Sequence, residues 1–446
     1  MIKRHEPLHI LVIYAILLNM GEKQTKKSNP VYDESKIKTL SSLEHIRLRT
    51  GMYIGRLGDG TNQNDGIYIL LKEVIDNAVD EFIMGNGKRI DVEIKDNRVK
   101  VRDYGRGIPQ GKLVDCVSVI NTGAKYNSEV FQFSVGLNGV GTKAVNALSS
   151  YFRVVSVREG KAAEAIFERG KLISNKTAKI KEGTKDGTYV EFVPDTEIFG
   201  QYAFNMEFVE RRLWNYAYLN AGLTIVCNGA KYVSEKGLLD LLNSELEGES
   251  LYPVGYYKGK QIEFSFTHSN AYGENSFSFV NGQFTSDGGT HLSAFKEGFL
   301  KGVNEFYRKN YKSEDVREGM AAAVAVKIQD PIFESQTKNK LGNTDIRAPI
   351  VQAVKDAVVT HLYKFPDVAA VLVDKVQRNE KVRRELQSVR RDAKARAKKI
   401  VLNIPQLKDC KYHPAAGKPS KAGRENMIFI TEGQSAAGSI VRSRDP

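Results

Sequence analysis

The sequence predicts an α+β protein built from layered domains, and three observations support this prediction. Helical and strand patterns are mixed along the 446 residues without strict alternation, which disfavours a doubly wound parallel sheet. Hydrophobic residues make up 41% and charged residues 27%, as in ordinary soluble globular proteins. A chain of this length can bury more than one core, so we expect two or three domains.

We expect five segments along the chain. Residues 1–30 are expected to be a disordered or artefactual start, and residues 31–235 to form the first α+β domain. Residues 236–410 form a second domain, and residues 411–424 are expected to be a linker because Pro, Gly, Lys and Ser are frequent there. Residues 425–446 are too few for a domain, so we expect them to begin a third domain that the sequence does not complete.

The first residues carry an apolar run that is too short to cross a bilayer, so we expect no membrane span. Residues 8–18 follow Lys3 and Arg4, as in the apolar region of a signal peptide, but no clear small-x-small cleavage site comes after them. We expect Met20 to be the true start and residues 1–19 to be an artefact or a disordered extension. A signal peptide is the alternative.

Composition indicates a cytoplasmic protein with a polyanionic partner. Cys116, Cys227 and Cys410 lie far apart without metal-ligand spacing, which is typical of reduced thiols in the cytoplasm. The formal net charge is +13, and residues 375–399 hold eleven Lys and Arg against three acidic residues. No Pro or Gly interrupts this stretch. It predicts a long basic helix that faces DNA phosphates or, alternatively, one that only keeps the protein soluble.

Hydrophobic periodicity predicts the elements of the first domain. An arm at residues 31–37 precedes a helix at Ser42–Arg49. A second helix has a buried stripe of Leu70, Leu71, Val74, Ile75, Ala78 and Phe82. Residues 90–95 and 99–101 alternate around Asp96-Asn97 and predict a hairpin. Further predicted elements are a helix at 142–148 and strands at 152–157, 163–168 and 188–193.

The second domain is predicted to contain a parallel βαβ crossover. Its parts are a strand at 276–280, a helix at 289–307 and a strand at 321–328. A loop at 330–343 leads to a helix at 346–363 and then to the basic helix. An apolar strand at 427–431 is expected to open the third domain.

Glu73 and Asn77 are the first candidates for chemistry. They lie four residues apart on a predicted helix, so they sit side by side on its polar edge, where a solvated edge is the plain alternative. A carboxylate beside an amide oxygen can hold a water and a hard cation together. Asp103 then ends the second hairpin strand and is followed by Gly105 and Gly107, where the backbone can approach a ligand closely.

A second glycine-rich loop, Gly136 to Lys143, runs into a helix N-terminus. Exposed N–H groups and the helix dipole favour phosphate at such a place. The loop lacks the G-K-[ST] ending of a Walker loop. It also lacks the clean preceding strand of a Rossmann βαβ unit.

Together, E-x-x-x-N on a helix, D-x-G-x-G after a strand and G-x-x-G-x-G into a helix resemble the Bergerat-fold (GHKL) ATPases. Further segments resemble the B subunits of bacterial type IIA DNA topoisomerases, namely Arg49–Gly55, Gly183–Pro194, Gln336–Lys338 and Thr431–Ala436. The resemblance covers residues 31–446. It implies a GHKL ATPase α/β sandwich at 31–235, a transducer domain at 236–410 and then the first strand of a Toprim domain.

The resemblance also implies ATP and Mg²⁺ as cofactors. Glu73 would be the general base for the attacking water, and Asn77 would hold the Mg²⁺ that bridges the phosphates. Asp103 would accept the adenine amino group, with Thr188 supporting it. Residues implied to surround the nucleotide are Gly105, Gly107, Ile108, Pro109, Lys125, Gly136, Leu137, Asn138, Gly139, Val140 and Gly141.

Other implied roles lie outside the first domain's core. Lys338, in a loop with Gln336, would reach the γ-phosphate only while ATP is intact, so hydrolysis would release the second domain. Tyr32 and Ile37 match an arm that crosses onto the partner subunit's nucleotide. Glu432 matches the Toprim glutamate of strand cleavage and a Toprim Mg²⁺ ligand, but the Asp-x-Asp pair is absent. We therefore expect ATP hydrolysis from this chain and no DNA cleavage.

Duplex DNA, a homodimer through the ATPase domains and a topoisomerase A subunit in an A2B2 heterotetramer are the implied partners. Departures at Val135, Asn138 and Gln434 favour topoisomerase IV over gyrase without excluding gyrase. One alternative is another GHKL ATPase, a mismatch-repair clamp or a heat-shock chaperone, against which residues 432–436 speak. Another is a DNA-binding protein with a vestigial nucleotide site, against which an intact Glu73 speaks.

Overall fold

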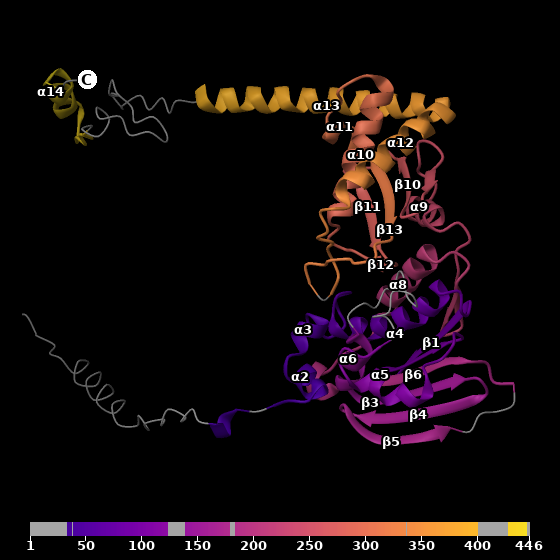
Figure 1. Cartoon of the computed structure of the whole chain (residues 1–446). Coiled ribbons are helices and arrows are strands. Elements are labelled where there is room, and N and C mark those ends of the chain that lie inside the picture. The colour runs from indigo at the N-terminus through magenta and orange to yellow at the C-terminus, as the bar shows by residue number, and fades with distance from the viewer. Residues whose placement is uncertain are drawn as a thin grey trace, which may run out of the picture.

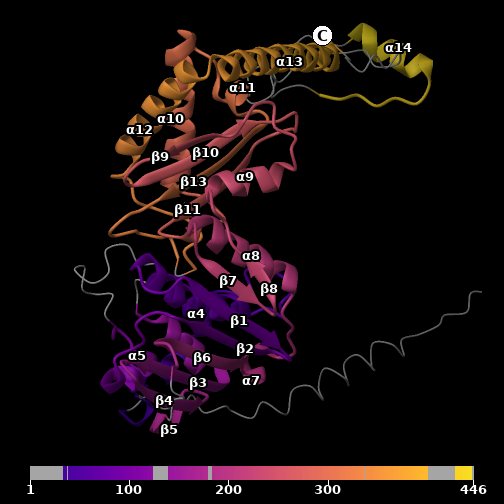
Figure 2. The ribbon, with the colours of Figure 1, turned by 90° about the vertical axis from the view of Figure 1, so that its right-hand side faces the viewer.

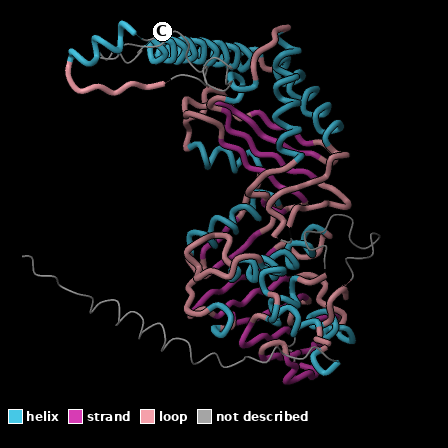
Figure 3. The backbone as a smooth tube through the Cα atoms, turned by 90° about the vertical axis from the view of Figure 1, so that its left-hand side faces the viewer, coloured by secondary structure: helices cyan, strands magenta, loops and turns pink. Residues whose placement is uncertain are grey.

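The chain forms two α/β bodies that follow one another along a long axis in this computed structural model (Figure 1). The strands of their two sheets form separate groups, one beyond the other (Figure 3). We call the part at residues 42–232 the first body and the part at residues 238–399 the second body. The structure describes residues 34–37, 39–123, 139–178, 183–335, 337–399 and 427–443.

The first body is built on an eight-stranded mixed sheet in the order β5-β4-β3-β6-β2-β1-β7-β8. Its pairs are antiparallel except for the parallel pair β1–β7. This topology confirms the α+β class and is incompatible with a doubly wound parallel sheet. The strands are β1 (Arg89–Lys95), β2 (Arg98–Asp103), β3 (Ser149–Arg158), β4 (Lys161–Glu168), β5 (Lys171–Ala178), β6 (Gly187–Pro194), β7 (Thr224–Cys227) and β8 (Ala230–Tyr232).

The predicted hairpin is confirmed as β1–β2. Lys95 faces Arg98 across a two-residue turn, and Asp96 and Asn97 have φ values of 50° and 61°. Positive φ at both central residues marks a type I′ turn, whose twist matches that of the strands. The turn fixes the register, so β2 ends at Asp103.

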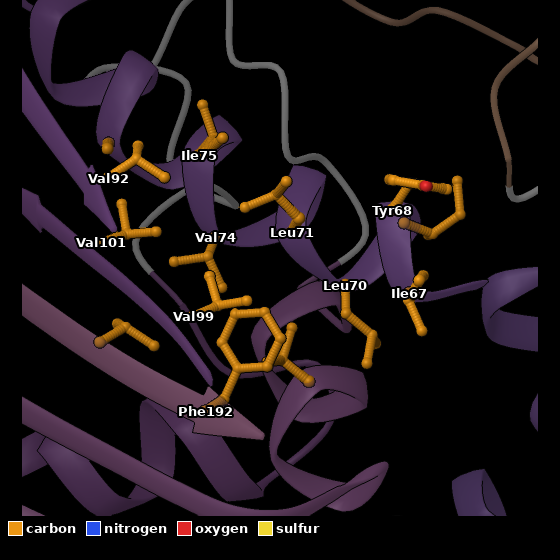
Figure 4. Close-up of a cluster of buried hydrophobic side chains, with 14 of the residues drawn as sticks. Ile67, Tyr68, Leu70, Leu71, Val74, Ile75, Val92, Val99, Val101 and Phe192 are labelled. Atoms are coloured by element: carbon orange, nitrogen blue, oxygen red, sulfur yellow. The ribbon is translucent and has the colours of Figure 1, made fainter. Parts of the chain in front are cut away.

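Helices cover one face of this sheet, and α4 (Gly66–Ile83) is the longest of them. Leu70 and Val74 lie with Val99 and Phe192 in the core beneath the helix (Figure 4). The predicted apolar stripe is buried, except that Phe82 is only partly covered. The other elements of this body and its arm are η1 (Glu34–Lys36), α2 (Ser42–Leu48), α3 (Thr50–Ile54), η2 (Gln110–Lys112), α5 (Leu113–Ser118), α6 (Gly141–Ala147), α7 (Thr196–Phe199) and α8 (Met206–Leu219).

The second body has a five-stranded sheet in the order β12-β11-β13-β10-β9. β11 and β13 pair in parallel and are joined through α10, as the predicted crossover requires. Figure 2 shows α10 and α12 on one face of the sheet and α9 on the other. The elements are α9 (Leu238–Leu246), β9 (Gly255–Lys258), β10 (Ile262–His268), β11 (Asn275–Val280), β12 (Gln283–Phe284), α10 (Thr290–Tyr307), α11 (Ser313–Arg317), β13 (Met320–Val326), α12 (Arg347–Lys364) and α13 (Pro366–Lys399).

The predicted strand at 427–431 is wrong. Residues 427–431 are in no strand, and Met427, Ile428 and Ile430 are highly exposed. A strand needs a neighbour to pair its backbone groups, and no described segment pairs with this one. The segment at residues 427–431 leads into α14 (Gln434–Ser443). In the described part of the chain, no helix combines the length and apolar character that crossing a bilayer requires.

Truncating Leu71 tests the packing that positions α4. Leu71 is fully buried, so Leu71→Ala should lower the free energy of unfolding by about 2–5 kcal/mol through lost burial and a residual cavity. Chemical denaturation followed by circular dichroism measures this. Leu172→Ala on β5 is the matched control, since Leu172 is 48% exposed and its truncation should cost less than about 1 kcal/mol. Equal effects of the two changes would contradict the assigned packing.

Candidate functional site

A cavity of about 360 Å³ opens between α4, the ends of β2 and β6, the start of α6 and a loop of the second body. Its volume suits a small-molecule ligand. The residues that line it include Glu73, Asn77, Asp103, Gly107, Ile108, Pro109, Gly139, Val140, Gly141, Thr188 and Lys338. The cavity thus brings together side chains that are 265 positions apart in the sequence, from Glu73 to Lys338.

Glu73 faces this cavity from α4. Only 8% of the residue is exposed, and its side chain lines the cavity, so the alternative of a plain solvated helix edge does not hold for Glu73. A β-carbon at Gly141 would collide with Oε2 of Glu73, so a side chain where α6 begins would displace this carboxylate. The buried carboxylate therefore lies directly against the start of α6, as a general base near a phosphate site would.

Asn77 lies beside Glu73, as its spacing on the helix predicts. Its Nδ2 donates to the backbone oxygen of Glu73 at 2.7 Å and to Oγ1 of Thr142 at 2.9 Å. These two bonds fix the plane of the amide at the cavity wall. The amide carbonyl is an oxygen ligand of the kind Mg²⁺ takes together with phosphates, so the residue fits a nucleotide-borne Mg²⁺.

Asp103 is buried at the end of β2. Its Oδ1 accepts the backbone N–H of Gly105 at 2.9 Å and that of Thr188 at 3.0 Å, which leaves Oδ2 as the carboxylate oxygen for a ligand. Burial raises the pKa of Asp103 to about 6, against the opposing effect of these two N–H groups. Thr188 therefore supports Asp103, as the sequence implied, and does so through its backbone.

Gly107 shows why the first glycine segment tolerates no side chain. Its φ is +72°, and a β-carbon there would collide with the backbone oxygen of Val157. Ser156 Oγ donates to the backbone oxygen of Ile108 at 2.6 Å and ties the segment to β3. Gly105 does not line the cavity; it packs against Glu81, whose carboxylate binds the backbone N–H of Arg106 at 2.9 Å.

Apolar side chains form the wall next to Asp103. They come from α4, β2, β3 and β6 and are Val74, Ala78, Val101, Val154 and Val190. Together they match the flat, apolar face of an aromatic base. The sequence predicted Val74 and Ala78 only as part of the buried helix stripe and gave none of the five a place in the site, because the same residues also belong to the core.

Lys338 reaches the cavity from the second body. The residue is 3% exposed and has a φ of +59°. The same loop touches the first body at another point, since a β-carbon at Gly55 would lie 2.9 Å from Cγ2 of Thr337. The loop therefore joins the two bodies at the cavity.

Several predicted residues are not placed in this site. Tyr32, Lys125, Gly136, Leu137, Asn138 and Gln336 lie outside the described residues. Ile37 is 66% exposed and does not line the cavity. Glu432 is exposed and also lies away from the cavity lining. Within the described ranges, no three His, Cys, Asp or Glu side chains gather where they could bind a metal.

The structure adds residues that sequence reasoning missed. Lys143 is buried at the cavity, and its Nζ donates to the backbone oxygen of Thr122 at 2.6 Å. Lys72 is buried beside Glu73, with Nζ 3.5 Å from Oε1. Both are direct neighbours of motif residues, so only their position next to Gly141–Thr142 and Glu73 hinted at them.

Comparisons with known families agree with this geometry. Residues 62–198 match a family described as histidine kinase-, DNA gyrase B- and HSP90-like ATPase, and residues 231–392 match a family described as DNA gyrase B. The DNA topoisomerase 4 B subunit of Borreliella burgdorferi is 58% identical over 93% of this chain and 69% of its own length. The DNA gyrase B subunit of Clostridium acetobutylicum is 32% identical over 94% of this chain and 69% of its own length.

Solved structures lead to the same family. The 43K ATPase domain of Thermus thermophilus gyrase B, in complex with an aminocoumarin, superposes with a TM-score of 0.61 at 31% identity, covering 79% of this chain and 98% of its own. The topoisomerase IV ATP-binding domain of Francisella tularensis has a TM-score of 0.59 at 25% identity, covering 77% and 98%. With relatives this similar over most of both lengths, the chain belongs to the B subunits of type IIA DNA topoisomerases and carries their GHKL ATPase fold.

Proposed function

We propose that the cavity binds ATP with Mg²⁺ and that Glu73 catalyses its hydrolysis. One observation supports this above the others: Glu73, Asn77, Asp103 and Lys338 come from two bodies and line a single cavity. The family supports the reaction class, and the geometry is compatible with the role that we propose for each residue.

The proposed reaction starts with recognition of the base. Oδ2 of Asp103 accepts a hydrogen bond from the adenine amino group while the apolar wall covers the ring. At the other end Glu73 takes a proton from a water as the water oxygen bonds to the γ-phosphorus and the bond to ADP breaks. The Mg²⁺ supplies charge neutralisation to the phosphates, and the Asn77 carbonyl oxygen would hold it.

Lys338 gives this reaction a mechanical consequence. Its ammonium group would contact the γ-phosphate while its loop stays anchored to the second body through backbone hydrogen bonds of Asn339 and Leu341. Loss of the γ-phosphate removes that contact, so hydrolysis would weaken the attachment of the second body to the first. ATP binding would close the dimer and hydrolysis would reopen it, which gates the passage of duplex DNA. The arm that includes Tyr32 and Ile37 would complete the partner's site.

We further propose topoisomerase IV rather than gyrase as the type of enzyme. The higher identity to a topoisomerase IV B subunit, 58% against 32%, supports this. The partners would be duplex DNA and an A subunit in an A2B2 assembly in the cytoplasm. Glu432 is proposed as a Toprim residue that acts in DNA cleavage.

The basic helix α13 is the proposed contact for DNA. Its first turns pack on the rest of the second body, where Leu372 and Val376 are fully buried. Arg383 anchors it further, with Nε 2.6 Å from Oδ1 of Asp315. Residues 384–394 are exposed, and this stretch is rich in Arg and Lys. Exposed cations along one continuous helix can bind the phosphates of a DNA backbone.

Removing the carboxylate of Glu73 should separate binding from turnover. Glu73→Ala should lower kcat by at least about 100-fold, the usual share of a general base, while the Kd for a non-hydrolysable ATP analogue changes little. Steady-state ATPase assays and calorimetry measure the two quantities. Glu93→Ala, an exposed glutamate on β1, is the control. Comparable loss of binding and turnover in Glu73→Ala would overturn the role.

Asp103 should make adenine binding depend on pH. Its pKa of about 6 means that the carboxylate is ionised above that pH and protonated below it, and only the ionised form leaves Oδ2 a pure acceptor. Asp103→Asn would place an N–H opposite the adenine amino group and weaken ADP binding at neutral pH by about 10- to 100-fold.

The measurement is the ratio of ADP affinities of wild type and Asp103→Asn across the pH range. The titration of the phosphates is common to both proteins and cancels in the ratio. The advantage of wild type should shrink as pH falls through about 6. A ratio that does not change with pH would contradict the proposed contact.

Lys338 should distinguish ATP from ADP. Lys338→Met keeps the aliphatic stem but removes the ammonium, so binding of a non-hydrolysable ATP analogue should weaken by about tenfold or more. ADP binding should change less than about twofold, since ADP lacks the phosphate that Lys338 is proposed to touch. Lys340→Met is the control from the same loop, because Lys340 is exposed and pairs with Glu334 at 2.8 Å. Parallel weakening of both nucleotides would refute the assignment.

A further inference from the structure

A network of buried polar side chains contacts Glu73 at Oε1, whereas Gly141 lies at Oε2. Lys72 is 2% exposed, and its Nζ lies 2.8 Å from Oδ2 of Asp76 and 3.5 Å from Oε1 of Glu73. Asp76 is fully buried, and its Oδ1 accepts the hydroxyl of Tyr216 from α8. This network thus connects Tyr216 through Asp76 and Lys72 to Glu73.

Charge compensation alone does not require the contact with Glu73. A buried ammonium needs one carboxylate to offset its charge, and Asp76 provides it in an i,i+4 pair. Neighbours at i,i+1 on a helix do not normally face each other, yet the long side chain of Lys72 also reaches Glu73. Lys72, Asp76 and Glu73 together carry one positive and two negative charges, so the three side chains keep one net negative charge. Of the two carboxylates, Glu73 lines the cavity and Asp76 does not.

The two oxygens of Glu73 have different surroundings as a result. Oε1 lies toward Lys72, and Oε2 lies toward Gly141 at the start of α6. A carboxylate on a flexible side chain would otherwise sample several rotamers. Holding one oxygen therefore selects the orientation of the other.

We propose that Lys72 is a positioning residue for Glu73: it holds Oε1 so that Oε2 faces the reacting water, while Asp76 and Tyr216 hold Lys72. The inference rests on the proposed ATPase function and adds a residue that does not line the nucleotide cavity. Lys72 instead lines a second cavity of about 180 Å³ between the two bodies, together with Arg212. Its role is to orient the base, and it makes no contact with nucleotide.

The protonation state of Lys72 agrees with this role. Burial lowers its pKa, but the carboxylates of Asp76 and Glu73 outweigh burial and raise it above the ordinary value. Arg212 on α8 opposes them weakly, and Tyr216 is kept neutral because burial raises its pKa well above the ordinary value. Lys72 therefore stays an ammonium at neutral pH.

Replacing Lys72 should slow turnover without loosening the nucleotide. Lys72→Met should lower kcat by about 100-fold through a misdirected base, while the Kd for a non-hydrolysable ATP analogue stays within about threefold of wild type. Lys72→Arg should restore part of the rate, and Lys100→Met, which removes a half-buried lysine on β2 that pairs with Glu93 away from the cavity, should change nothing.

A double variant separates positioning from folding. Lys72→Met leaves the buried charge of Asp76 without the cation that offsets it, and this loss would destabilise the fold on its own. Lys72→Met/Asp76→Asn removes both charges and should melt near the wild-type temperature but stay about 100-fold slow. Wild-type turnover in the double variant, or in Lys72→Met, would overturn the inference.

The proposed function is tested by the same set of proteins. If wild type hydrolyses ATP and Glu73→Ala does not, the proposed function stands, and the Lys72 variants alone decide the inference. If wild type fails to hydrolyse ATP, or Glu73→Ala still does so, the proposed function fails whatever the Lys72 variants show.

Discussion

The fit of α4 between a sheet and a cavity is the constraint on which the site depends. The helix is buried on nearly all sides, so its apolar stripe packs on β2 and β6 while Glu73 and Asn77 face the cavity. The absence of a side chain at Gly141 lets α6 begin directly against the carboxylate. A protein interior is close-packed, so a shift of α4 would displace the carboxylate and the amide together. Precision at the reacting end of the cavity therefore comes from core packing.

The second body contributes little to the cavity lining, yet its contribution has the greatest consequence for coupling. Its loop touches Gly55 through Thr337 and brings the buried Lys338 to the cavity. A ligand shifts an equilibrium between two arrangements only if it binds them differently. The proposed contact between a lysine of one body and the terminal phosphate of a ligand held by the other would meet this requirement. The signal of hydrolysis would then be carried by α12 and α13, which continue from this loop.

Local chemistry made much of the fold predictable, and the errors lie in edge strands and in an apolar segment without a pairing partner. Asp96-Asn97 predicted the hairpin because only a few residues accept positive φ in both turn positions. The stripe on α4 and the parallel crossover of β11 and β13 followed from periodicity. Edge strands such as β5 and β8 were missed although each pairs with the strand directly before it, because an edge strand buries few apolar residues: Leu172 and Ile173 of β5 are exposed. The strand expected at 427–431 was wrong because apolar content does not supply a pairing partner.

The candidate site was predictable where a motif fixes the backbone and unpredictable where a side chain reaches across the fold. Asp103 and Gly107 were recognised because strand end and glycine spacing carry their chemistry locally. The contact of Glu73 with Lys72 and the bond from Tyr216 to Asp76 were missed, since helical spacing shows neither that Lys72 reaches back to its neighbour nor that α8 packs against α4. Sequence patterns report which residues share one helix face, and they do not report what packs against that face.

A crystal structure with a non-hydrolysable ATP analogue and Mg²⁺ would test the proposed nucleotide site most directly. The adenine amino group should lie on Oδ2 of Asp103, the metal on the Asn77 carbonyl oxygen and the terminal phosphate beside Lys338. Glu73 would then face the γ-phosphorus through one water. A nucleotide bound elsewhere, or bound in this cavity with its phosphates turned away from Glu73 and Lys338, would contradict it.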